Sequence, residues 1–152
     1  MSKITPFLWY DDPQAEEAAN YYVSVFNNAK VLSVSRGPDG KAFTVSFELD
    51  GQEFMGLNAG PMFKFNEAIS MYVNCEDQAE VDYFWSKLSA APESEQCGWC
   101  KDQFGLSWQI IPRQLGELMG DPDPERSGRV MQAMLKMKKI IVADLKSAHE
   151  GA

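Results

Sequence analysis

The segment Cys97-Gly98-Trp99-Cys100 has the cysteine spacing of a redox dithiol or of half a zinc site. A working redox pair needs a thiol of lowered pKa, usually at the N-terminus of a helix. Here the flanking sequence favours a strand, and residues three apart on a strand point to opposite faces. We therefore expect Cys97 and Cys100 to serve in packing or pocket lining, with redox chemistry and zinc binding as the alternatives.

The chain contains a single histidine, His149, close to its C-terminal end. Imidazole is the side chain most often used as a general base near neutral pH. Because His149 lies so far along the chain, we expect it to be exposed to solvent and to have no catalytic role.

Other polar side chains fall on defined faces of predicted strands. Alternation within a strand places Phe7 with Trp9 on one face and Ser70 with Tyr72 on another. Gln109 lies on the face of its strand opposite to Trp108. A sheet face that mixes polar and aromatic side chains is typical of a sheet that encloses a ligand, although a sheet facing solvent is the alternative.

The elements that carry these residues follow one order twice. The first half predicts a strand at 4–10, a helix that Asp11-Asp12-Pro13 caps and begins, and strands at 30–35, 42–49 and 52–58. The second half predicts a strand at 68–75, a helix capped by Asp77 and Glu80, and strands near 95–101 and 106–111. A third strand near Glu93 is less distinct, so this module is compressed. Helices are expected at 113–119, from 123 and at 142–148.

Composition limits the classes of function. The chain has 152 residues and a net charge of −8, which disfavours binding to nucleic acid or to anionic membranes. Three cysteines, with no signal segment and no long apolar run, indicate a cytoplasmic protein. We expect a single domain over residues 1–152, with modules at about 1–58 and 67–112 and a helical extension at about 113–152.

Three segments carry a family likeness: 58–70, 96–109 and 129–140. They resemble the PhnB-like branch of the glyoxalase, or vicinal-oxygen-chelate, superfamily. The resemblance implies an α+β fold in which two βαβββ modules form a curled mixed sheet around a small-molecule cup. It also implies a homodimer, for which Met131, Met134 and Leu135 offer an apolar helix face.

Metal-dependent relatives place His or Glu ligands on the first and last strands of each module. The matching positions here are approximately Thr5, Met55 or Gly56, Ala68 and Gln109, which are weak donors or none. We therefore predict no metal and no cofactor. Members of this branch are often described as 3-demethylubiquinone 3-methyltransferases. The junction Tyr10-Asp11-Asp12-Pro13, however, lacks the glycine-rich loop by which the common methyltransferase fold approaches its methyl donor.

Three functions remain open. The favoured one is a metal-free module that binds an unidentified small molecule; the alternatives are an isomerase, lyase or dioxygenase with unrecognised catalytic groups, and a structural module without ligand. The predicted ligand-binding residues combine aromatic walls with polar groups: Phe7, Trp9, Asn58, Ser70, Tyr72, Trp99 and Gln109.

Overall fold

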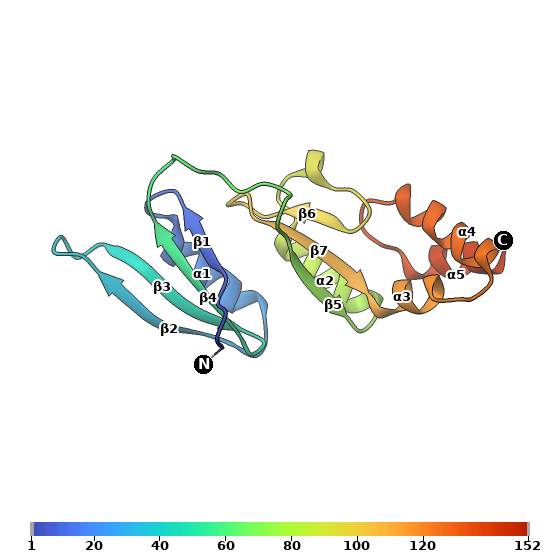
Figure 1. Ribbon diagram of the computed structural model, residues 1–152, viewed down its shortest axis with the longest axis horizontal. Coiled ribbons are helices and arrows are strands. Elements are labelled where there is room, and N and C mark those ends of the chain that lie inside the picture. The colour runs from blue at the N-terminus through green and yellow to red at the C-terminus, as the bar shows by residue number, and fades with distance from the viewer. Residues whose placement is uncertain (1, 152) are drawn as a thin grey trace. The chain divides into compact units, whose positions relative to one another are not determined.

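The computed structural model describes residues 2–151, which divide into two compact units between Phe65 and Asn66. The first unit contains five elements, coloured blue to green in Figure 1. They are β1 (Phe7–Tyr10), α1 (Gln14–Val25), β2 (Ala29–Arg36), β3 (Ala42–Leu49) and β4 (Gln52–Asn58). This order is the βαβββ module that the sequence predicted.

The first unit is a sheet of order β1-β4-β3-β2 with α1 packed on one face. β1 runs parallel to β4, and the other neighbours are antiparallel. Alternate residues of β1, β3 and β4, such as Leu8, Tyr10, Val45 and Phe47, are buried on the α1 side. The helix places Ala15, Ala18, Ala19, Tyr22 and Val25 against them, because small residues let the helix approach the sheet closely.

The start of α1 differs from the sequence prediction. Asp11-Asp12-Pro13 was expected to cap the helix, but the N-cap residue is Pro13 and no cap side chain bonds the helix from that position. The side chain of Asn58, at the end of β4, replaces it: Oδ1 accepts the Ala15 N–H at 2.8 Å. Asn58 also donates from Nδ2 to the Ala42 carbonyl at 3.0 Å, so this amide joins three elements.

The second unit opens with β5 (Met71–Cys75), α2 (Gln78–Leu88) and the short 3-10 helix η1 (Pro92–Ser94). Two further strands, β6 (Trp99–Lys101) and β7 (Ser107–Pro112), complete a sheet of order β5-β7-β6. The predicted strand at 68–75 begins only at Met71, and η1 lies where a third strand was considered. The capping of α2 is confirmed, since Asp77 Oδ1 accepts the Glu80 N–H at 3.0 Å.

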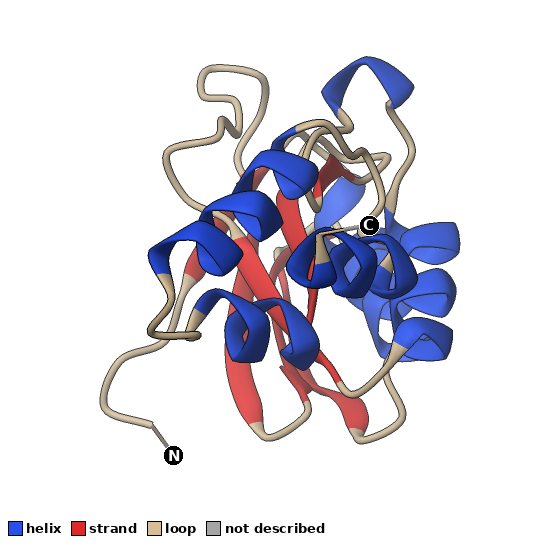
Figure 2. Cartoon of the chain, turned by 90° about the vertical axis from the view of Figure 1, so that its right-hand side faces the viewer, coloured by secondary structure: helices blue, strands red, loops and turns tan. Residues whose placement is uncertain are grey.

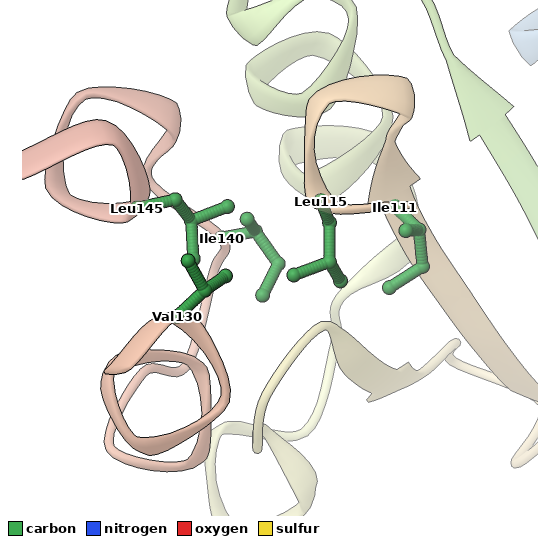
Figure 3. Close-up of a cluster of buried hydrophobic side chains, with 5 residues drawn as sticks. All are labelled: Ile111, Leu115, Val130, Ile140 and Leu145. Atoms are coloured by element: carbon green, nitrogen blue, oxygen red, sulfur yellow. The ribbon is translucent and has the colours of Figure 1, made fainter. Parts of the chain in front are cut away.

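Three helices end the chain: α3 (Arg113–Met119), α4 (Pro124–Leu135) and α5 (Val142–Glu150). Figure 3 shows a cluster of buried side chains that point toward a common centre. Each of the three helices contributes one, and β7 and the loop between α4 and α5 contribute one each: Leu115, Val130, Leu145, Ile111 and Ile140. Met134 packs against this cluster, whereas Met131 and Leu135 are 42% and 48% exposed. Of the three residues proposed for a dimer contact, Met134 therefore contributes to the interior of its own chain.

The prediction that His149 is exposed was wrong. Its side chain is 18% exposed, and Nε2 lies 2.7 Å from Asp121 Oδ2, because the last turn of α5 packs beside the residues that precede α4. Arg129 secures the same turn by donating to the carbonyls of Ala148 and His149, each at 2.8 Å.

The fold class is α+β, as predicted, with strands and helices of both units distinguished by colour in Figure 2. The strands form two hydrogen-bonded sheets, one in each unit, and neither sheet is closed. Within residues 2–151, no helix combines the length and the apolar character that crossing a bilayer requires.

Candidate functional site

The turn between β6 and β7 is held by the side chain of Asp102, which is buried. Oδ1 accepts the N–H groups of Phe104 and Leu106 at 2.9 and 3.1 Å, and Oδ2 accepts the Trp108 indole N–H at 2.9 Å. Gly105, with φ of +90°, gives the turn a conformation that side chains disfavour. Asp102, Gly105 and Trp108 are therefore structural residues that fix the position of both strands.

The Cys-x-x-Cys segment is a second tight turn. Gln96 and Trp99 exchange backbone hydrogen bonds at 3.0 and 2.7 Å around Cys97 and Gly98. Both central residues have positive φ, +38° and +89°, as a two-residue hairpin turn of type I′ requires. A Cβ on Gly98 would come within 2.6 Å of Ile111 Cδ1. The positive φ and the close contact with Ile111 therefore explain why residue 98 is a glycine.

The two thiols of this segment differ in environment. Cys100 is 1% exposed, and burial, with the negative charges of Asp102 and Glu95, raises its pKa to about 12. Cys97 is half-buried and lies outside the regular strand. A pKa raised in this way is the reverse of what an attacking thiol needs. The structure offers no support for redox chemistry at this pair.

One row of side chains crosses the sheet of the second unit, β5-β7-β6, on the face that is turned away from α2. Gln109 on β7 is opposite Tyr72 on β5 and opposite Trp99 on β6 in the strand register. Gln109 also donates from Nε2 to the Ser70 hydroxyl at 3.0 Å. Four of the predicted ligand-binding residues are thus neighbours on a single face of the second unit, which we call the open face.

A cavity of about 380 Å³ adjoins this row at the edge strand β6. Its lining combines one aromatic ring with charged and polar side chains: Glu67, Glu93, Ser94, Gln96, Cys97, Trp99, Cys100, Lys101 and Ser107. The volume lies in the range of small-molecule sites in proteins, about 300 to 1,000 Å³. Trp99 belongs both to the row and to the cavity, so the two features adjoin at its side chain.

Ser107 is the unusual member of this lining. It is 1% exposed, and its Oγ has no hydrogen-bond partner among residues 2–151. Leaving a buried hydroxyl unpaired costs about 1 to 3 kcal/mol. A group that is bound beside Ser107 and accepts or donates a hydrogen bond would remove this cost.

Lys101 lies opposite Ser107 in the register of β6 and β7. Its Nζ is 2.8 Å from Glu67 Oε1, with the lysine side chain 26% exposed and the glutamate side chain 65% exposed. The hydrogen bond from Lys101, followed by its positive charge, lowers the pKa of Glu67 below the usual value. The cavity therefore contains a cation on β6 and a carboxylate on the irregular segment that precedes β5.

Three predicted residues belong to the first unit. Phe7 and Trp9 share the face away from α1; Phe7 is 54% exposed, and the Trp9 indole donates to the Gly60 carbonyl at 2.9 Å. Asn58 lies on the other face, where its amide bonds two backbone groups. The sequence had grouped Asn58 with Gln109 as an orienting group, but strand parity turns it toward the helix.

The residues at the positions of the superfamily's metal ligands do not fit a metal. Thr5, Met55 or Gly56, and Ala68 supply no strong donor, and the Gln109 amide is bonded to Ser70. In the part of the chain that the structure describes, no group of three His, Cys, Asp or Glu side chains has the arrangement of a metal site. The prediction of a metal-free protein rests on this donor chemistry.

Sequence reasoning missed Lys101 and Ser107 as site residues. Strand parity could have found them, because both are two positions from residues that were selected: Lys101 from Trp99, and Ser107 from Gln109. Asp102, which lies between them in the chain, has a structural role, because its carboxylate holds the turn between β6 and β7.

Comparison with known proteins places these residues in a family context. The model of the family described as 3-demethylubiquinone-9 3-methyltransferase matches residues 2–111. Among solved structures, the putative 3-demethylubiquinone-9 3-methyltransferase, PhnB protein, from Bacillus cereus is 35% identical with a TM-score of 0.63. That alignment covers 73% of this chain and 99% of the other chain. No curated protein matches the sequence.

Two more distant structures share the fold. A gene product from Arabidopsis thaliana is 17% identical with a TM-score of 0.51, over 72% of this chain and 97% of its own. Protein PA1353 from Pseudomonas aeruginosa is 14% identical with a TM-score of 0.52, over 74% of this chain and 98% of its own. At these identities the likeness concerns architecture alone.

Proposed function

The chain belongs to the family described as 3-demethylubiquinone-9 3-methyltransferase, the PhnB-like branch of the glyoxalase superfamily, and we propose that it is a small-molecule binding protein. The observation that carries the proposal is the row Tyr72, Gln109 and Trp99, which adjoins a cavity at Trp99. An aromatic wall next to a few polar groups is the usual construction of a ligand site.

Each residue of the row has a part in the proposed binding. The Trp99 ring covers an apolar surface of the ligand, because burial of apolar area contributes about 25 cal/mol per Å². Gln109 orients the ligand through its carbonyl oxygen, since its amide nitrogen donates to Ser70. A hydrogen bond of this kind adds about 1 kcal/mol.

Methyl transfer, which the family description names, finds no support in the first module. A methyltransferase of the common fold holds its donor at a glycine-rich junction between the first strand and helix. Here the Gln14 N–H donates to the Asp11 carbonyl and the Ala15 N–H donates to Asn58, each at 2.8 Å. These amides of the helix N-terminus are therefore already bonded within the chain.

We also propose a homodimer, since Met131 and Leu135 expose an apolar strip one turn apart on α4. Light scattering should give about twice the chain mass of 17.1 kDa. A mass of one chain at micromolar concentration would contradict the dimer and leave the binding site unaffected.

Titration with 2-naphthamide, an uncharged planar probe, tests the binding function. We expect a dissociation constant in the millimolar range or lower, equivalent to about 4 kcal/mol or more. Trp99→Ala should abolish the signal, whereas Trp85→Ala, a tryptophan of α2, is the matched control. Absence of binding to the unmodified protein, or equal losses in both variants, would contradict the proposal. Native mass spectrometry of the purified protein would then identify any ligand that is retained.

A further inference from the structure

The Lys101 ammonium is largely shielded from water and needs an anionic partner. Its side chain is only 26% exposed, and a cation removed from water needs a negative partner. It is the one cation among the residues that line the cavity described above. Glu67 is that partner within the chain, at 2.8 Å.

Glu67 is a weakly held partner. Its side chain is 65% exposed, and residues 66–70 form no strand or helix. Exposed ion pairs contribute about 0 to 1 kcal/mol, because water solvates the separated charges well. A carboxylate supplied by a ligand can therefore replace Glu67 on Lys101 at little cost.

A ligand beside Lys101 would also have to provide a hydrogen-bond partner for the Ser107 hydroxyl. Its hydroxyl is buried without a partner among the described residues, directly across the strand register from Lys101. A carboxylate has two oxygens, so one can accept from the Lys101 ammonium and the other from the Ser107 hydroxyl. An amine could donate to the Ser107 hydroxyl but could not neutralise the Lys101 ammonium, and a purely apolar group would satisfy neither of them.

The remaining charged residue of the lining is a carboxylate that opposes a bound anion only weakly. Glu93 also lines the cavity, but it is exposed on η1, where solvent and salt screen its charge. The Trp99 ring lies two positions from Lys101 on β6, on the same face of the strand. The site thus combines an anion-binding end with an aromatic wall.

We propose that the cavity binds a small carboxylate with a planar apolar body, whose carboxylate displaces Glu67 from Lys101 and bonds Ser107. The proposal rests on the binding function above and names its ligand class. The volume of about 380 Å³ suits a molecule of one or two rings.

Three probes of one shape test the ligand class: 2-naphthoate, 2-naphthamide and (2-naphthylmethyl)ammonium, titrated at low ionic strength. We expect 2-naphthoate to bind about tenfold more tightly than the amide, because charge-assisted hydrogen bonds are the stronger ones. The ammonium probe should bind more weakly than either. Equal affinity for carboxylate and amide would overturn the ligand class and leave the binding function standing, whereas no binding of any probe would contradict both.

Variants of the ion pair test the residues. Lys101→Met should abolish the preference for carboxylate over amide, and Glu67→Gln should tighten 2-naphthoate binding about threefold by removing the competing carboxylate. Lys139 and Asp82 form a matched ion pair at 2.8 Å elsewhere in the second unit. Lys139→Met and Asp82→Asn should leave the preference unchanged.

If Lys101→Met folds poorly, Glu67→Gln still tests the site, because Glu67 is exposed and its substitution should not disturb folding. Weaker binding of 2-naphthoate to Glu67→Gln would overturn the displacement of Glu67. A carboxylate preference that survives in folded Lys101→Met would overturn the role of Lys101.

Discussion

The Gln109 side chain donates a hydrogen bond to the Ser70 hydroxyl at 3.0 Å, although the two residues lie 39 positions apart in the chain. Ser70 precedes β5 and Gln109 lies in β7, so the parallel pairing of these strands brings the two together. Because this bond fixes the amide nitrogen of Gln109, it also fixes the orientation of the carbonyl oxygen of the same planar amide. Tyr72 and Trp99 are the neighbours of Gln109 on the adjacent strands. Gln109, at a position where the family resemblance implies a metal ligand, is thereby part of the row on the open face.

Neighbouring residues on β7 should respond in opposite ways to substitution. Trp108 is 2% exposed on the α2 side, so Trp108→Ala should lower the free energy of unfolding by about 3 to 5 kcal/mol. Gln109→Ala removes one partly buried hydrogen bond and should cost about 1 kcal/mol, while weakening ligand binding. Denaturant unfolding of both variants checks this. A larger loss for Gln109→Ala would reverse the two faces of the strand and remove the open face as a site.

Strand parity and turn residues predicted most of the fold, because both are local properties of the chain. Phe7 with Trp9, and Gln109 opposite to Trp108, follow from alternation alone. Asn58 was misplaced because its role depends on Ala15 at the start of α1, which lies 43 positions away in the sequence. Lys101 and Ser107 drew no attention because their pairing across two strands, and the burial of the hydroxyl, are tertiary properties.

Two glycines with nearly equal φ angles should differ in their tolerance of a side chain. Gly98 and Gly105 have φ of +89° and +90°, which costs a non-glycine residue about 1 to 3 kcal/mol. A Cβ on Gly98 would also lie 2.6 Å from Ile111 Cδ1, in a packed cluster, whereas one on Gly105 meets nothing within 4 Å. We expect Gly98→Ala to cost about 1 kcal/mol more than Gly105→Ala in thermal unfolding. Equal losses would show that the cluster yields to the new methyl group.

The three cysteines should react with iodoacetamide at pH 8 in a definite order. Burial raises the pKa of both Cys75 and Cys100 to about 12, so neither forms much thiolate at this pH. Cys97 is half-buried and should be alkylated first. Peptide mass spectrometry should find one modified site in the folded protein and three after denaturation. A reversible disulfide between Cys97 and Cys100, at a potential near that of cytosolic glutathione, would contradict the structural role assigned to this segment.

Acid should weaken the C-terminal helices through Asp121. The Asp123 N–H, and then His149, lower the pKa of Asp121 below its ordinary value of 3.8. A carboxyl group with a lowered pKa contributes stability above its ordinary pKa and loses it as the pH falls toward the lower, folded value. In Asp121→Asn, the fall in melting temperature below about pH 4 should therefore be less steep. An unchanged slope would mean that Asp121 does not couple protonation to folding.

The indole N–H resonances of Trp99 and Trp108 test the site most directly, because these two tryptophans lie on opposite faces of the second sheet. Titration of nitrogen-15-labelled protein with 2-naphthoate should shift the Trp99 signal, since Trp99 lines the cavity on the open face. The signal of Trp108, whose indole bonds Asp102 on the α2 side, should stay in place. Saturable movement of Trp99 without Trp108 is the result that this account predicts. Movement of Trp108 with Trp99 unchanged would contradict it.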